Sequence, residues 1–469
     1  MLREAAVPGE PHAVVASRNG ELVYVLGTAE NAVSVLNART LEEVRRLSTG
    51  QGPWSAAIGP GGESLYITNV RPDRGQFQAT PVSEITVVDM HENVVTSRPR
   101  IAGANMLQGI ALIPGTDVVA FTLMRTKSLV PVTRLAQGWT ITNGLGLVWP
   151  DGRVAQVLLD EPNESFPDPM DLAVSPDGRR LLVTSGGSDR IAVVDVSNLL
   201  ETVDRATPRE RADVLPNHLG MSSRFVVKRL DVGRNPRGVA FSPDGRYAYV
   251  ANALDDTVSV IDAEEATVVG AIDLNGPKIV TELRLGARKF HSAAISFGQQ
   301  FSCRSCHPDG HVNGLTIDIE ADGIGNSPVD NRTLRGILDT APFKWEGTNP
   351  SLNRQCGPRL AVFFTRLAPY TPADLTALVR YISTIPRPPN PHRDPAGLTL
   401  SQRRGKMIFD RRETRHGRLI PPDQRCVTCH SSGYGTSRAL AGVGTTMWLD
   451  GEIDIPLNDL HETTGFGAL

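Results

Sequence analysis

Two short cysteine–histidine strings are the residues of this chain best suited to carry chemistry. Five cysteines occur in 469 residues, and four of them lie in the strings CRSCH at 303–307 and CVTCH at 426–430. Two thiols on one helical turn can each form a thioether with a vinyl group of a haem, and the adjacent histidine can then ligate the iron. A zinc ribbon would not need a histidine after both pairs, and a thioredoxin-like redox pair would not be duplicated. The spacing therefore predicts two covalently bound c-type haems.

The two motifs define the expected haem sites residue by residue. The thioether residues are Cys303 and Cys306 in the first motif and Cys426 and Cys429 in the second. The iron ligands that follow them are His307 and His430. The fifth cysteine, Cys356, has no such neighbour, and we expect a small buried hydrophobe there rather than a reactive thiol.

A sixth ligand for either iron is harder to assign. Met447 follows His430 by 17 residues, and its thioether is a candidate sixth ligand for the second iron. The alternative is that Met447 packs in the core. His311 lies too close to His307 in the chain to reach the opposite haem face, so we expect it at the surface. Two further candidates are His291 and His416.

Composition limits the class of protein. Charged residues make up 21% of the chain and the net charge is −3, so nothing favours nucleic acid or an anionic surface as a partner. No run of 18 apolar residues occurs, and no transmembrane helix is expected. Residues 1–14 lack the apolar core of a secretory signal, although haem c is normally attached outside the cytoplasm. We therefore expect a periplasmic or otherwise extracytoplasmic protein whose given start is trimmed or misplaced.

Residues 1–276 repeat a short pattern of β-branched runs and turns. The clearest copy, 236–262, contains SPDG, YAYVAN and TVSVID, and a second copy spans 169–195. Weaker copies begin near Pro11 and Pro53, and a degenerate one occupies about 105–162. Three or four such strands in about 40 residues make one propeller blade. The repeats predict an all-β propeller with about five blades, and the charged stretch 197–226 is interpreted as an insertion outside the core.

After Gly276 the pattern becomes helical. Segments 281–290 and 401–409 precede the two haem motifs, and each has a glycine and a phenylalanine four residues apart, which indicates a duplicated module. Between them, residues 371–384 predict a helix with Thr371 as its N-cap. The following run of prolines at 386–391 is expected to be a stiff linker.

These elements predict a multidomain chain. The N-terminal all-β propeller is assigned to 1–276, and two mainly α cytochrome c modules follow at 277–390 and 391–469. The second module is expected to be shortened at its C-terminus.

The repeat sequences YVAN and VSVID resemble those of bacterial YVTN-type seven-bladed propellers. The two haem modules, together with NRTLRG at 331–336, TAPF at 340–343 and WEG at 345–347, resemble dihaem cytochrome c peroxidases. They also resemble the related enzyme that matures the cofactor of methylamine dehydrogenase. The chain looks like a member of the subgroup in which a propeller precedes the haem modules.

The resemblance implies roles for particular residues. Peroxide would react at the N-terminal haem, the C-terminal haem would relay electrons, and Trp345 between them would help electrons cross. Gln355 matches a glutamine of the family's site. The family's acid–base glutamate has no counterpart, because the stretch 360–366 reads LAVFFTR. The resemblance also implies Ca²⁺ between the haem modules and a small cytochrome or cupredoxin as redox partner.

Three functions follow. The first is a peroxidase-like dihaem oxidoreductase, to which the two-module layout, Trp345 and Gln355 point. The second is an electron-transfer protein without bond chemistry, favoured by the missing glutamate, whose propeller serves as a docking platform. The third is a propeller-scaffolded subunit of a larger multihaem complex, as in hydrazine-forming assemblies.

Overall fold

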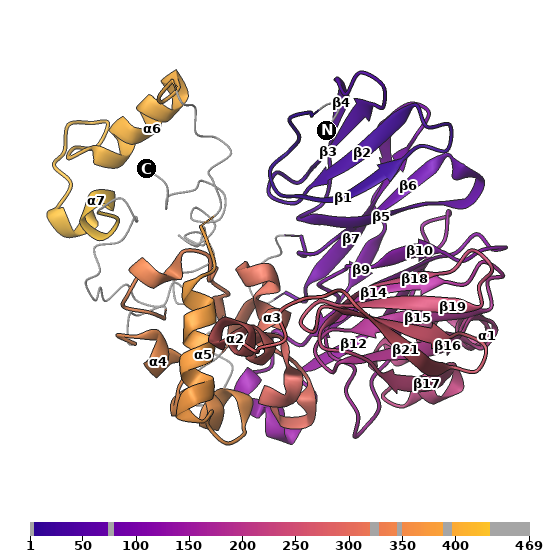
Figure 1. The fold of residues 1–469 in the computed structure, drawn as a ribbon. Coiled ribbons are helices and arrows are strands. Elements are labelled where there is room, and N and C mark those ends of the chain that lie inside the picture. Colours follow the sequence, from indigo (N-terminus) through magenta and orange to yellow (C-terminus); the bar gives the residue numbers. More distant parts are fainter. Residues whose placement is uncertain (1–3, 74–78, 319–327, 345–348, 388–395, 432–469) are drawn as a thin grey trace.

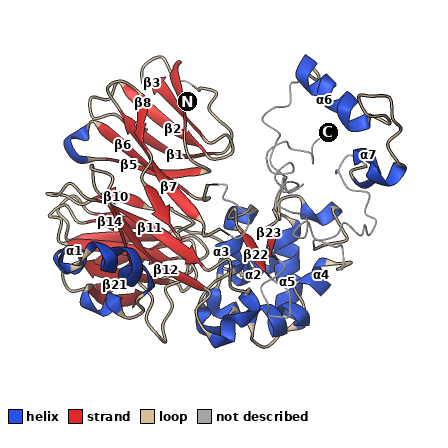
Figure 2. Ribbon diagram, turned by 180° about the vertical axis from the view of Figure 1, so that it is seen from behind, coloured by secondary structure: helices blue, strands red, loops and turns tan. Residues whose placement is uncertain are grey.

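The computed structural model describes residues 4–73, 79–318, 328–344, 349–387 and 396–431 (Figure 1). Within these ranges most strands gather on one side of the molecule and most helices on the other, where the pair β22 and β23 also lies (Figure 2). None of the described helices is long and apolar enough to cross a lipid bilayer.

The strand-rich part consists of five antiparallel sheets, one for each repeat of the sequence. Blade 1 comprises β1 Pro11–Ala16, β2 Leu22–Gly27, β3 Ala32–Asn37 and β4 Glu43–Ser48. Blade 2 comprises β5 Pro53–Ile58, β6 Ser64–Asn69, β7 Val82–Asp89, β8 Val94–Ser97 and β9 Arg100–Ala102. Blade 3 comprises β10 Ile110–Leu112, β11 Val119–Thr126, β12 Ile141–Val148 and β13 Val154–Leu158. Blade 4 comprises β14 Pro169–Val174, β15 Arg180–Ser185, β16 Arg190–Asp195 and β17 Val226–Asp231. Blade 5 comprises β18 Pro236–Phe241, β19 Tyr247–Asn252, β20 Thr257–Asp262 and β21 Thr267–Asp273.

The expected propeller is thus present, with five blades among the described residues. The first strands of successive blades contact one another in the order β1, β5, β10, β14 and β18, as the inner strands of a propeller do.

Alternation along the strands explains how the blades hold together. On β15, Leu181 and Val183 point into the core shared with blade 3, while Leu182 points into the core shared with blade 5. Because successive side chains of a strand face opposite sides of the sheet, one short apolar run serves two neighbours.

Blade 5 has one face that no further blade of the described chain covers. In blade 4, Leu182 and Leu230 are 0% and 7% exposed beneath blade 5. The residues at the matching register of blade 5, Tyr249 and Ile272, are 38% and 47% exposed. Blade 5 is therefore an end of the stack.

The expectation that 197–226 lies outside the core is wrong. This stretch forms α1, Val196–Arg205, and several short turns between β16 and β17. Leu199, Val203 and Phe225 are each at most 1% exposed and pack into the core of blades 3 and 4. The segment is charged on its outer side only, so its composition hides an apolar stripe.

The helical part begins after Asp273. It contains α2 Glu282–His291, α3 Cys303–Cys306, the pair β22 Thr316–Asp318 and β23 Pro328–Asp330, α4 Leu352–Gln355, α5 Pro372–Ser383, α6 Leu400–Asp410 and α7 Cys426–Cys429. The predicted N-cap of α5 is confirmed, because the Thr371 side chain accepts a hydrogen bond from the Asp374 amide. Helices α2 and α5 cross at Gly286, where a Cβ atom would lie 2.0 Å from the Ala377 carbonyl oxygen. That these helices form two cytochrome c modules stays a prediction.

Candidate functional site

The first haem motif is one helical turn held by its own flanking serines. The backbone amide of Ser302 donates to Ser305 Oγ at 2.9 Å, and the His307 amide donates to the Cys303 carbonyl at 2.9 Å. This turn, α3, carries Cys303 and Cys306 on the same short element and places His307 directly after it.

His307 has the setting of a metal-binding imidazole. Its Nδ1 lies 3.3 Å from the His311 carbonyl oxygen, which requires that nitrogen to be the donor. Burial lowers the pKa of His307 to about 4 and outweighs the hydrogen bonds to the His311 and Arg332 backbone. The ring is therefore neutral at physiological pH, the form that ligates iron, and a donated Nδ1–H is the usual way such a ligand is oriented.

The surroundings of the two thiols are apolar. Cys303 packs with Phe290, Phe343, Leu352 and Cys356, and Cys306 packs with Phe301 and other members of a second cluster. Burial raises the pKa of the Cys306 thiol to about 12 and also raises that of Cys303. Both side chains are neutral, half-buried thiols.

A haem would fit this donor set. The Tyr370 hydroxyl is buried without a hydrogen-bond partner, and the pKa of Tyr370 is raised by burial and then by nearby Cys303. A pocket of about 240 Å³ opens beside it, and Leu360 and Tyr370 line both this pocket and the apolar cluster around Cys303. Two thiols on one helical turn, followed by a neutral imidazole, are the donor set that a haem c site uses.

The motif is fastened to the propeller at Asp168. Ser302 Oγ donates to Asp168 Oδ2 and Ser305 Oγ donates to Asp168 Oδ1, both at 2.6 Å. Asp168 is 1% exposed and lies in the connection from blade 3 to blade 4, with a left-handed φ of 53°.

Arg304, between the two cysteines, is buried in the same junction. It is 0% exposed, and its Nη1 donates to Gln108 Oε1 of the propeller at 3.4 Å. Burial lowers the pKa of Arg304, while Asp309 and Asp168 favour its charged form.

Further contacts join the motif's segment to the remaining blades. Arg335 pairs with Glu10 before blade 1, and Arg71 Nη1 lies 3.4 Å from His311 Nε2 at blade 2. Gln300 Oε1 accepts from the Thr140 amide of blade 3 at 2.9 Å, and Arg237 Nη1 of blade 5 pairs with Asp309 Oδ1 at 3.1 Å. With Asp168 next to blade 4, the described residues between 300 and 335 contact each of the five blades or the segment beside it.

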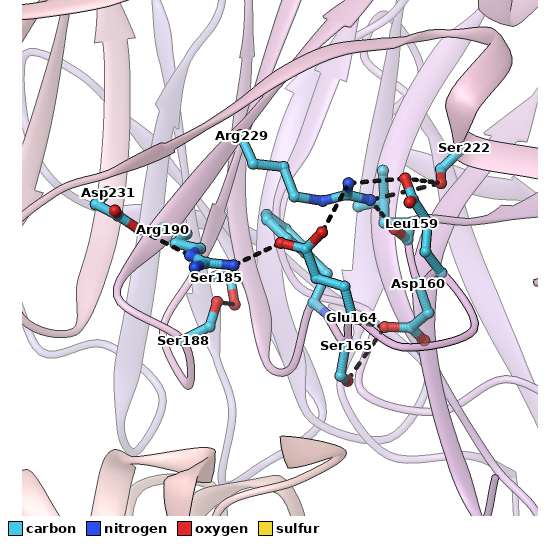
Figure 3. Close-up of polar contacts among 12 residues, drawn as sticks. Leu159, Asp160, Glu164, Ser165, Ser185, Ser188, Arg190, Ser222, Arg229 and Asp231 are labelled. Atoms are coloured by element: carbon cyan, nitrogen blue, oxygen red, sulfur yellow. Dashed lines mark hydrogen bonds and ion pairs between the residues drawn. The ribbon is translucent and has the colours of Figure 1, made fainter. Parts of the chain in front are cut away.

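A polar network holds the connection that carries Asp168 (Figure 3). Arg229 donates to Glu161 Oε1 and to the Leu159 carbonyl, both at 2.7 Å, and Arg190 pairs with Glu164 at 2.5 Å. Buried Asp160 accepts from the Phe166 amide at 2.7 Å. These contacts hold the backbone of residues 159–166 in place. Asp168 follows in the same connection, so its position relative to the haem motif is held as well.

The second motif forms a similar turn in a more open setting. The His430 amide donates to the Cys426 carbonyl at 2.9 Å, and the rings of His430 and Phe409 lie 6.5 Å apart. Cys426 is exposed, and the Cys429 side chain lies outside the described residues. Helices α6 and α7 contact each other and lie apart from α3 in both views (Figures 1 and 2).

The other site residues predicted from the sequence lie in different parts of the structure, and some lie outside the described residues. Gln355 accepts a hydrogen bond from Asn349 and precedes Cys356, which packs in the cluster around Cys303. Trp345 and Met447 lie outside the described residues. His291 is 5% exposed and has both ring nitrogens engaged, with Arg237 at 3.1 Å and the Ala287 carbonyl at 2.8 Å.

His311 is half-buried against Arg71, so the expectation that it lies at the surface is wrong. His416 is exposed and contacts Arg415 Nε at 2.9 Å. Within the described ranges, no group of three or more His, Cys, Asp or Glu side chains is placed to hold a metal ion, and calcium stays a prediction.

Comparisons with known proteins match the propeller. Residues 172–297 match the family described as "Lactonase, 7-bladed beta-propeller". The hydrazine synthase subunit beta of Kuenenia stuttgartiensis is 27% identical over 238 residues, which cover 50% of this chain and 60% of that protein. The hydrazine synthase subunit gamma of the same organism is 32% identical over 170 residues, which cover 34% of this chain and 45% of that protein.

A solved structure agrees with these relatives. One chain of Kuenenia stuttgartiensis hydrazine synthase superposes with a TM-score of 0.50 and 26% identity, covering 54% of this chain and 71% of that one. The chain is thus a β-propeller protein related to subunits of hydrazine synthase, and it spans 60% and 45% of the length of the two relatives.

Proposed function

We propose that this chain is a propeller-scaffolded c-type cytochrome subunit of a larger multihaem redox complex. The relatives that support this role are subunits of one enzyme, hydrazine synthase. The observation that carries the proposal is the junction at Asp168, where the propeller itself holds the first haem motif through Ser302 and Ser305. A propeller that served only as a separate docking platform would not need this buried contact.

The residues would divide the work as follows. Cys303 and Cys306, and Cys426 and Cys429, would hold two haems, with His307 and His430 as ligands, and each bound haem would supply a one-electron carrier. His307 keeps a neutral ring through burial and donates Nδ1–H to the His311 carbonyl. A small cytochrome or cupredoxin would exchange electrons with the subunit. We assign the protein to the periplasm or another compartment outside the cytoplasm, where haem c is attached.

Peroxidase-like chemistry is the second candidate. Gln355, beside the cluster that contains Cys303, favours it. The stretch 360–366 contains no carboxylate, so this part of the chain offers no acid–base group for cleaving a peroxide O–O bond. Electron transfer within a complex therefore accounts better for the residues present.

Haem counting tests the proposal. The chain, produced with a periplasmic haem-attachment system, should carry two covalent haems by intact mass and pyridine haemochrome assay. The double variants Cys303→Ala/Cys306→Ala and Cys426→Ala/Cys429→Ala should each carry one. Absence of covalent haem from the unaltered chain would sink the proposal.

Peroxide turnover separates the two candidates. With a reduced small cytochrome as donor, we expect the two-haem protein to consume hydrogen peroxide no faster than the Cys303→Ala/Cys306→Ala variant. Sustained turnover that is lost in this variant would favour the peroxidase-like function instead.

A further inference from the structure

We propose that Asp168 of the propeller is a positioning residue for the haem at Cys303 and Cys306, and that its carboxylate lowers that haem's reduction potential. The inference rests on the proposed function, since it concerns a haem attached at this motif. It goes beyond that function by making a propeller side chain part of the redox site.

The contacts around Asp168 are specific to the haem motif. Both carboxylate oxygens are occupied by side chains that immediately flank the cysteines, Ser302 before Cys303 and Ser305 before Cys306. Ser305 Oγ also accepts the Ser302 amide, so the carboxylate, both hydroxyls and the start of α3 form one closed network. A shift of α3 relative to the propeller would break both hydrogen bonds at once.

Burial makes the charge of Asp168 effective. Asp168 is 1% exposed, and Ser302 and Ser305 are 1% and 0% exposed, so little water screens the carboxylate from its surroundings. An oxidised haem iron carries one more positive charge than a reduced one. A buried negative charge beside the motif therefore stabilises the oxidised form and lowers the reduction potential.

Arg304 supplies the opposing charge. It is fully buried between the same cysteines, and its Nε and Nη2 have no hydrogen-bond partner, so neighbouring groups neutralise its charge only in part. Its guanidinium should raise the potential that Asp168 lowers. Asp168 and Arg304 would therefore act on the potential with opposite signs, beside the charges of Asp309 and Arg237, which also act on Arg304.

Potentiometric titration of the two-haem protein tests the inference. The wave of this haem is the one that disappears in the Cys303→Ala/Cys306→Ala variant. Asp168→Asn keeps the shape of the side chain and removes its charge, so this wave should move to higher potential. The ratio of reduced to oxidised haem at a fixed potential should rise roughly tenfold. Arg304→Gln should move the same wave to lower potential, and the second wave should stay in place in both variants.

The matched control is Asp171→Asn. Asp171 lies three residues away in the same blade and accepts the Val239 amide at 3.1 Å, a contact between two blades rather than with the motif. This change should leave both waves in place. A loss of propeller stability alone would not distinguish Asp168 from Asp171, whereas a selective shift of one wave does.

Positioning has its own measurement. Ser302→Ala/Ser305→Ala removes both hydroxyl donors and keeps the carboxylate, and it should broaden the electron paramagnetic resonance signal of this haem through a spread of orientations. An unmoved first wave in Asp168→Asn would overturn the inference, and so would an unchanged signal in the double serine variant. A haem-free first motif in the unaltered chain would overturn the proposed function and this inference with it.

Discussion

At the scale of single residues, the connection that carries Asp168 contains a second buried carboxyl group. Asp160 lies eight residues before Asp168 in the same connection and is 0% exposed. It accepts the Asn143 amide at 2.5 Å and the Phe166 amide at 2.7 Å, yet burial outweighs these bonds and raises its pKa to about 6. The ionised carboxylate therefore costs stability in the folded state.

The sign of the resulting pH dependence follows from linkage. A carboxyl group whose pKa rises on folding binds its proton more tightly in the folded chain, so its contribution is greatest below about pH 4. That contribution is lost as the pH rises through about 6. We expect Asp160 to remove about 2 kcal/mol from the free energy of unfolding between pH 4 and pH 7. Urea unfolding of Asp160→Asn across this range should show a flatter profile than the unaltered chain, with exposed Asp151→Asn as the control. Equal slopes for Asp160→Asn and the unaltered chain would contradict the assignment.

At the scale of elements, the strands could be predicted because their pattern is local. Alternation of apolar residues and Pro-Asp-Gly or Asn-Gly turns lies within about ten residues, and each of the five repeats became a sheet. The insertion was misjudged because Leu199 and Val203, four positions apart on α1, are scattered among charged neighbours. Asp168 could not have been found, because its partner Ser302 lies 134 residues away and neither residue stands out in the sequence.

The covered face of blade 4 and the matching, uncovered face of blade 5 predict different mutational costs. Leu182 on β15 is 0% exposed beneath blade 5, whereas Tyr249, at the matching position of β19, is 38% exposed on the uncovered face. Leu182→Ala should lower the free energy of unfolding by about 2–5 kcal/mol, because it leaves a cavity between two blades. Tyr249→Ala should cost about 1 kcal/mol or less. Denaturant titration measures both, and equal losses would mean that the blade 5 face is covered in solution.

At the scale of the whole molecule, the helical segment and the propeller share one core. Phe301, just before the first motif, is 2% exposed and packs with Trp54 of blade 2 and Ile141 of blade 3. Together with the polar contacts to the blades and the segments beside them, this packing predicts that the propeller and the first motif unfold together.

Phe301→Ala tests this cooperation. The change should lower the free energy of unfolding by about 3–5 kcal/mol and shift the transition of the whole propeller. Tryptophan fluorescence, which includes Trp54, and far-ultraviolet circular dichroism should agree with each other on the midpoint in the unaltered chain, and again on the shifted midpoint in Phe301→Ala. Two separate midpoints in the unaltered chain would show that the motif and the propeller fold independently.

The docking of the described residues between 300 and 335 against the propeller also has a consequence for the attachment of a haem. Arg335 pairs with Glu10, so a segment more than 300 residues later in the sequence completes a contact with the start of the propeller. Haem attachment needs both cysteines within reach of an enzyme, whereas the docked motif buries Arg304 completely. If a haem is attached at this motif, as proposed, its attachment would have to precede the docking of α3 against the propeller. If α3 docked against the propeller before attachment, the first motif would remain without haem. The rate of blade assembly would then limit the fraction of molecules that carry this haem.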